Sequence, residues 1–203
     1  MSTAPKMPGS APDNVSGVNP AAPAAAPAAA PAAAPAAALT AAPAPVTHTP
    51  RGEKAKALFL QGYNCTQSVV LAFGDLTGLD EKTAAMLSSS FGGGMGRLRE
   101  VCGALSGAFL VAGCLYGYSQ PRDLDGKKEH YARVRDIAAR FKAKNGSYIC
   151  RELLSGLNVG MADASFKRTD EYYKKRPCGE LVADAADIIN ELIKETGSKN
   201  EQK

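Results

Sequence analysis

The sequence predicts an all-α fold, an irregular bundle of about six or seven helices around a glycine-rich central helix. Apolar residues recur at spacings of three and four through most of residues 51–203, and no segment shows a convincing strand-like alternation. The two prolines of this region, Pro121 and Pro177, fall where the helical pattern breaks. An uncharged segment at 101–118 supplies an apolar centre that the amphipathic segments can cover.

The first 50 residues differ sharply in composition from the rest. They hold 11 of the 13 prolines, and Lys6 and Asp13 are their only charged residues before Arg51. Such a stretch has few large apolar side chains to bury, so we expect a disordered, extended and semi-rigid Ala/Pro-rich tail or linker, native or cloning-derived. It lacks the basic start and leucine-rich centre of a signal peptide. Residues 51–203 are long enough for one helical domain with its own core.

Each predicted helix follows from a local signal. Apolar spacing gives helices over about 53–61 and 65–73, and Asp80 can cap the next one, which ends at the glycine run 92–96. A further helix covers about 127–144, a short one the motif "CRELL", and the clearest about 178–195. No element is assigned to 158–176.

The segment 101–118 has 18 residues without charge, close to the lower limit for a membrane span. Its glycines at 103, 107, 113 and 117 allow close helix approach in lipid or in water. Amphipathic neighbours can cover it, so we interpret it as the buried central helix and expect no membrane association.

Four cysteines, Cys65, Cys102, Cys150 and Cys178, each stand at a predicted helix start and on the apolar face of that helix. Unpaired N–H groups and the positive end of the helix dipole lie beside a sulfur in this position, which lowers the thiol pKa. We therefore expect four thiols to converge on one electropositive site. Cysteine also packs as a small hydrophobe, and Cys114, in mid-helix, is assigned to packing.

Several chemistries are disfavoured. The glycine run "FGGGMGR" follows a helix and lacks the "GK[ST]" ending, so no nucleotide site is expected; its glycines instead allow backbone amides to approach a buried sulfur. There is no "CxxCH" motif for haem. His130 is the one histidine in 51–203, since His48 falls in the tail, and no catalytic residue is assigned. The net charge of +4 comes from interleaved charges and does not indicate nucleic-acid binding.

The motifs "GYNCTQSVVLAF", "FGGGMGRLREVCGALSGAFLVAG", "CRELL" and "CGELVADAADII" resemble, in order, the blocks of the C_GCAxxG_C_C family of redox-active proteins. The resemblance spans 53–195, and the element "CGAxxG" at Cys102–Gly107 is its most specific part. It implies a small α-helical protein with redox chemistry, whose four family cysteines correspond to Cys65, Cys102, Cys150 and Cys178. Related domains occur in iron–sulfur-containing multihaem cytochromes.

Three functions remain open. The first is an iron–sulfur protein for electron transfer or redox sensing, with Cys65, Cys102, Cys150 and Cys178 as ligands. The second is thiol–disulfide chemistry by two or four of these cysteines, and the third a zinc-stapled interaction domain. Five cysteines without an export signal indicate a reducing, cytoplasmic location. The expected partner is a redox protein, and the interpretation allows for a homodimer.

Overall fold

The computed structural model describes residues 47–157 and 168–200, so the tail assigned to residues 1–50 lies largely outside the described residues, and residues 158–167 lie wholly outside them. Within the described part, every regular element is a helix apart from an isolated bridge between Val101 and Ile149. The all-α prediction is confirmed. The elements are α1 Pro50–Leu60, α2 Cys65–Ala72, α3 Gly74–Thr77, α4 Glu81–Ser88, the 3-10 turn η1 Ser89–Phe91, α5 Gly103–Tyr116, α6 Leu124–Asn145, α7 Cys150–Leu153, α8 Asp170–Lys175 and α9 Cys178–Asn200.

Helix starts are fixed by local capping. Asn64 and Gln67 form a capping box at α2, because the Asn64 side chain accepts from the N–H groups of Thr66 and Gln67 while Gln67 accepts from the Asn64 N–H. Asp80 caps α4 as the sequence predicts, and its carboxylate accepts from the N–H of Thr83. The short helices α3 and α8 were not predicted, since four to six residues are too few to show a periodic pattern.

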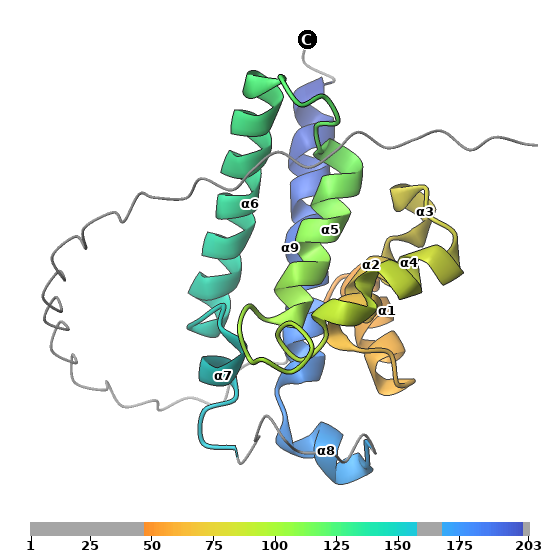
Figure 1. Cartoon of the computed structure of the whole chain (residues 1–203). Coiled ribbons are helices and arrows are strands. Elements are labelled where there is room, and N and C mark those ends of the chain that lie inside the picture. Colours follow the sequence, from red (N-terminus) through yellow and green to blue (C-terminus); the bar gives the residue numbers. More distant parts are fainter. Residues whose placement is uncertain (1–46, 158–167, 201–203) are drawn as a thin grey trace, which may run out of the picture. The chain divides into compact units, whose positions relative to one another are not determined.

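Helix α5 is the centre of the bundle. Figure 1 shows it running beside α6 and α9, and it also packs on α2. Its first six residues, 103–108, are all buried. In the described residues no helix is both long and apolar enough to span a membrane.

Two glycines bring α5 against α2. A Cβ placed on Gly107 would lie 2.8 Å from the Val69 Cβ and 2.9 Å from the Thr66 carbonyl oxygen. A Cβ on Gly103 would lie 2.9 Å from the Thr66 hydroxyl oxygen, which donates a hydrogen bond of 2.8 Å to the Gly103 carbonyl. These contacts confirm the predicted close approach for the first half of the helix. Gly113 does not take part, because nothing lies within 4 Å of its Cβ position.

Candidate functional site

The four predicted cysteines all stand at helix starts. Cys65, Cys150 and Cys178 are the first residues of α2, α7 and α9, and Cys102 is the N-cap residue of α5. All four line a single cavity with a volume of about 850 Å³. Cys102, Cys150 and Cys178 are buried, whereas Cys65 is partly exposed.

Backbone pairing holds Cys102 beside Cys150. The N–H of Cys102 donates to the Tyr148 carbonyl at 2.9 Å, and the N–H of Cys150 donates to the Glu100 carbonyl at 2.6 Å. The bridge between Val101 and Ile149 lies between these two bonds. Two helix starts that are distant in sequence are thus fixed on the same wall of the cavity.

The glycine run forms a tight turn against the sulfurs. Five consecutive residues from Gly93 to Arg97 have positive φ, a conformation that glycine adopts at little cost. At Gly94 a side chain is also excluded by space, because its Cβ would lie 2.7 Å from the Cβ of Cys150. The N–H of Gly93 donates to the Cys65 sulfur. The turn therefore brings a backbone amide to a thiolate, as the sequence predicts.

Cys65 and Cys178 form a hydrogen-bonded thiol pair. The Cys178 thiol donates to the Cys65 sulfur, which is the main reason that the pKa of Cys65 falls from its ordinary 9.0 to about 7. Burial opposes this shift, while the positive charge of Arg168 and the N–H groups of Gly93 and Cys65 support it. The same bond raises the pKa of Cys178, because it holds the proton on that sulfur. The pair shares one proton, with the negative charge on Cys65.

The other two thiols remain protonated. Burial raises the pKa of Cys102 to about 12, although the N–H groups of Ala104 and Leu105 favour its thiolate. Burial also raises the pKa of Cys150, against the opposing effect of a hydrogen bond from Arg99. The expectation that helix starts lower all four thiol pKa values is therefore wrong for Cys102, Cys150 and Cys178. At Cys102 and Cys150 desolvation of a buried anion exceeds the stabilisation from a helix N-terminus, whereas at Cys178 the hydrogen bond to Cys65 is the largest cause and burial adds to it.

Comparison with protein families matches residues 63–192 to the family described as "Putative redox-active protein (C_GCAxxG_C_C)". The chain belongs to the C_GCAxxG_C_C family. The matched range contains all four cavity cysteines, and the family description agrees with a redox role for them. Searches among curated proteins and among solved structures give no significant match.

The expected convergence of four thiols on one point is not seen at metal-ligand distances. Among the described residues, no three cysteine sulfurs lie within 4.8 Å of one another. A tetrahedral zinc ion with Zn–S bonds of about 2.3 Å would need sulfurs about 4 Å apart. In this member of the C_GCAxxG_C_C family the cysteines thus share a cavity, and only Cys65 and Cys178 share a hydrogen bond.

Cys114 differs from its predicted role. It was assigned to packing, but its residue is exposed on the second half of α5. That end of the helix is less covered than the first half, so a mid-helix position does not place a side chain in the core. Cys114 does not line the cavity.

The cavity is rich in arginine. Arg97, Arg99, Arg168 and Arg176 line it, and Asp170 is the one acidic residue among the described lining residues. Arg97, Arg99 and Arg176 stand within five residues of one of the four cysteines in the sequence, whereas Arg168 is ten residues from the nearest of them. Of the other basic residues near the cysteines, Arg151 pairs with Glu100 at 2.6 Å and Lys175 lies 3.9 Å from Glu171.

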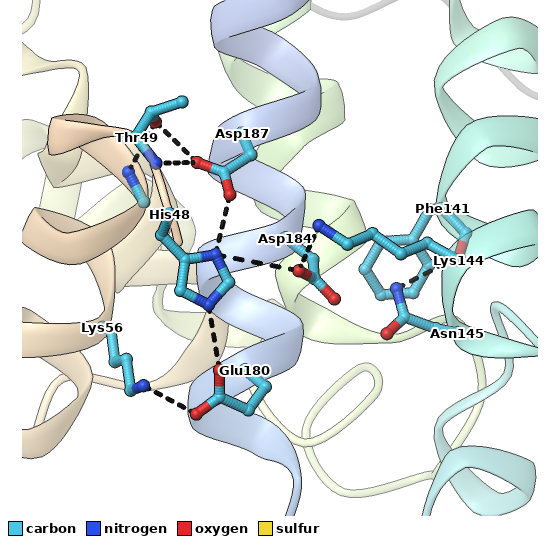
Figure 2. Close-up of polar contacts among 10 residues, drawn as sticks. His48, Thr49, Lys56, Phe141, Lys144, Asn145, Glu180, Asp184 and Asp187 are labelled. Atoms are coloured by element: carbon cyan, nitrogen blue, oxygen red, sulfur yellow. Dashed lines mark hydrogen bonds and ion pairs between the residues drawn. The ribbon is translucent and has the colours of Figure 1, made fainter. Parts of the chain in front are cut away.

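A second cluster lies on α9, around His48 (Figure 2). The His48 ring nitrogens lie 2.7 Å from Asp187 and 2.9 Å from Glu180, and Thr49 also donates to Asp187. Burial lowers the pKa of His48, but the bonds to Glu180 and Asp187 outweigh it and the net pKa is raised. The sequence placed His48 in the tail, yet its side chain is buried against α9.

His48, Asp184 and Asp187 are also the one group of the described residues with three ligand atoms within 4.8 Å of one another. Lys144 already lies 2.7 Å from Asp184, and both imidazole nitrogens have carboxylate partners. These ion pairs balance the acidic groups without a metal ion. The cluster attaches the start of α1 to α9 and is a structural feature.

Proposed function

We propose that this protein is a thiol–disulfide redox protein in which Cys65 attacks and Cys178 resolves. The observation that carries the proposal is the hydrogen bond from the Cys178 thiol to the Cys65 sulfur, with a pKa of about 7 for Cys65. A thiolate is the nucleophile in disulfide exchange, and a thiol with a pKa near the ambient pH attacks most effectively. As a residue, Cys65 is also less buried than the other three cavity cysteines.

The reaction can be written from these two residues. The Cys65 thiolate attacks one sulfur of a partner disulfide, the partner's S–S bond breaks, and one partner thiolate leaves. Cys178 then loses its proton and attacks the Cys65 sulfur, which releases the second half of the partner as a thiol. The protein loses two electrons and gains a Cys65–Cys178 disulfide, while the partner disulfide becomes two thiols. An external dithiol returns the protein to its reduced form, and the cytoplasm is the compartment that would supply one.

The test is mild oxidation followed by peptide mapping. A Cys114→Ser protein would be treated with one equivalent of a thiol oxidant, alkylated and digested with trypsin, which separates Cys65 and Cys178 into different peptides. The proposal predicts a linked Cys65–Cys178 pair, and Cys102→Ala should leave this product unchanged. Loss of the linked peptide in Cys65→Ser and Cys178→Ser, together with retention in Cys102→Ala, is the expected pattern. If oxidation instead links Cys102 to Cys150, or links no pair, the assignment is wrong.

A second function, iron–sulfur cluster binding, is supported by a different observation. Cys65, Cys102, Cys150 and Cys178 line the same cavity, and the donor set of four thiolates is the one that clusters prefer. In a [4Fe–4S] cluster each thiolate binds a separate iron, so the sulfurs need not meet as closely as they do around one zinc ion. These residues would hold the cluster, which would supply one-electron transfer, and arginine and backbone N–H groups on the wall would compensate its negative charge.

The two functions are separated by anaerobic purification. Cluster binding predicts brown protein with stoichiometric iron and sulfide, lost in Cys102→Ala and in Cys65→Ser. Thiol–disulfide function predicts colourless protein whose redox activity survives Cys102→Ala. A brown protein that loses its iron in Cys102→Ala would favour the cluster over the dithiol pair.

A further inference from the structure

We infer that the cavity binds a small disulfide that carries negatively charged groups, and that Arg99 recognises the charge. The inference rests on the proposed thiol–disulfide function and adds the class of substrate. It depends on four features of the cavity: a buried arginine with an unused donor, the balance of charge on the wall, the helix starts and the volume.

Arg99 is the decisive residue. It is 8% exposed, yet it lines the cavity. Its guanidinium donates to the Cys150 sulfur, while its Nε is buried and has no hydrogen-bond partner. A buried donor without an acceptor costs free energy, and an arginine offers several donors in one plane. Nε itself is closed off from the cavity, so a carboxylate there would pair with the guanidinium and supply the missing acceptor once the side chain rotates toward it.

The backbone at Arg99 keeps the side chain in this position. Its φ of 64° is in the left-handed region, which is uncommon for a residue with a side chain. The Arg99 carbonyl accepts from the N–H of Arg151 at 3.1 Å, so the strained residue is fixed by pairing with the start of α7. Strained backbone that is held by its surroundings is often found at functional sites.

The rest of the wall carries the same sign of charge. Arg168 donates to the carbonyls of Gly62 and Tyr63, at 3.2 and 2.7 Å, and its charge favours the Cys65 thiolate. Arg176 stacks on the Tyr172 ring, with its guanidinium carbon 4.4 Å from the ring centre. Both arginines are thereby held on the wall, and against them stands one carboxylate, Asp170, among the described lining residues. A cavity whose wall carries charge of one sign concentrates ligands of the opposite charge.

Helix starts add to this potential. Helices α2, α5 and α9 all begin at the cavity, and each has eight residues or more. Their N-termini present N–H groups and partial positive charge. On their own they would indicate no site, but they act in the same direction as the positive charge of Arg99.

The volume and the thiols decide the class of ligand. The cavity of about 850 Å³ falls in the range that holds small organic molecules and is much larger than a single oxoanion needs. Under the proposed function the reactive group is a disulfide, which the Cys65 thiolate and the Cys178 thiol together reduce to one thiolate and one thiol. The substrate therefore combines a disulfide with carboxylate-like groups.

The test compares three disulfides that have two methylene groups between each sulfur and its end group but differ in charge: 3,3′-dithiodipropionate, bis(2-hydroxyethyl) disulfide and cystamine. For each disulfide, the rate at which it oxidises the Cys65–Cys178 pair of the Cys114→Ser protein would be divided by the rate at which the same disulfide reacts with a small free thiol. The dianion should react about tenfold faster than the neutral compound and the cation slower still, with the preference shrinking as salt is added. Arg99→Met should remove most of the preference, and the surface control Arg122→Met should keep it.

A binding measurement makes the inference independent of the redox step. Suberate has the length of dithiodipropionate with methylenes in place of sulfurs, and it should slow alkylation of Cys65 in the parent protein but not in Arg99→Met. Arg176→Gln provides a second variant if Arg99→Met does not fold, as judged by circular dichroism. Equal normalised rates for the three disulfides and no effect of suberate would overturn the inference while leaving the dithiol pair intact. Protection by suberate without oxidation by any disulfide would instead overturn the proposed function and retain the anion site.

Discussion

Replacing Cys178 by alanine removes the hydrogen bond that contributes most to the low pKa of Cys65. With that bond the Cys65 pKa is about 7, so about half of the sulfur is thiolate at pH 7; at the ordinary value of 9.0 about 1% would be. The thiolate fraction therefore falls about 50-fold. A thiolate of higher pKa is intrinsically more nucleophilic, by about six- to tenfold over two pKa units when the Brønsted slope is about 0.4–0.5. The expected net loss at pH 7 is about five- to eightfold.

The same two effects predict a crossing of the pH profiles. Above about pH 9 both sulfurs are largely ionised, so Cys178→Ala should react faster than the parent protein by several-fold, with equal rates near about pH 8. The assay is the initial rate of chromophore release from 4,4′-dithiodipyridine between pH 5 and 10, in a Cys114→Ser background. Cys178→Ser is the matched control, because its hydroxyl can still donate to Cys65, and its profile should stay close to that of the parent. Parallel profiles for Cys178→Ala and the parent at every pH would refute the assignment of the low pKa to this bond.

Three further outcomes are expected. Gly107→Ala should destabilise the protein by about 1–3 kcal/mol in urea unfolding, because its new Cβ overlaps α2. Gly113→Ala on the same helix should be neutral or stabilising by up to about 1 kcal/mol, and equal losses at both positions would contradict this account of the packing. His48→Gln should cost most stability at low pH: the folded-state pKa is raised, so the contribution of His48 is complete below about pH 6.5 and disappears as pH rises through the folded value. A cost that does not change between pH 5.5 and 8.5 would contradict it. Alkylation of Cys114 should leave the rate of Cys65–Cys178 disulfide formation unchanged, since Cys114 is exposed and outside the cavity. The rate is measured by stopping the oxidation at set times with an alkylating reagent. A changed rate would place Cys114 in the redox site.

Local sequence signals predicted much of this fold. The sequence predicted the cap at Asp80, the uncharged segment 101–118 and the apolar face of α9. Each depends on residues close together in the sequence, so it can be recognised without a structure. The placement of four cysteines at helix starts follows from the same signals. Short helices such as α3 have no such pattern and depend on their neighbours.

The chemistry of the site depends on contacts that sequence spacing does not encode. Cys65 and Cys178 are 113 positions apart in the sequence, and nothing in either segment indicates that they pair rather than Cys102 and Cys150. Burial, which raises the pKa of Cys102, is a property of the assembled bundle. The role of His48 was missed because the alanine–proline composition around it hides a single buried side chain.

The measurement that tests the central claim most directly is a redox titration of the four cavity thiols. Protein would be equilibrated in buffers of defined thiol–disulfide potential, and the oxidised fraction of each cysteine would be read by differential labelling and mass spectrometry. We predict that Cys65 and Cys178 become oxidised together, in one two-electron transition with a slope of about 30 mV per tenfold change in ratio, while Cys102 and Cys150 stay reduced. Independent transitions for Cys65 and Cys178, or oxidation of Cys102 and Cys150 at the same potential, would contradict the pairing.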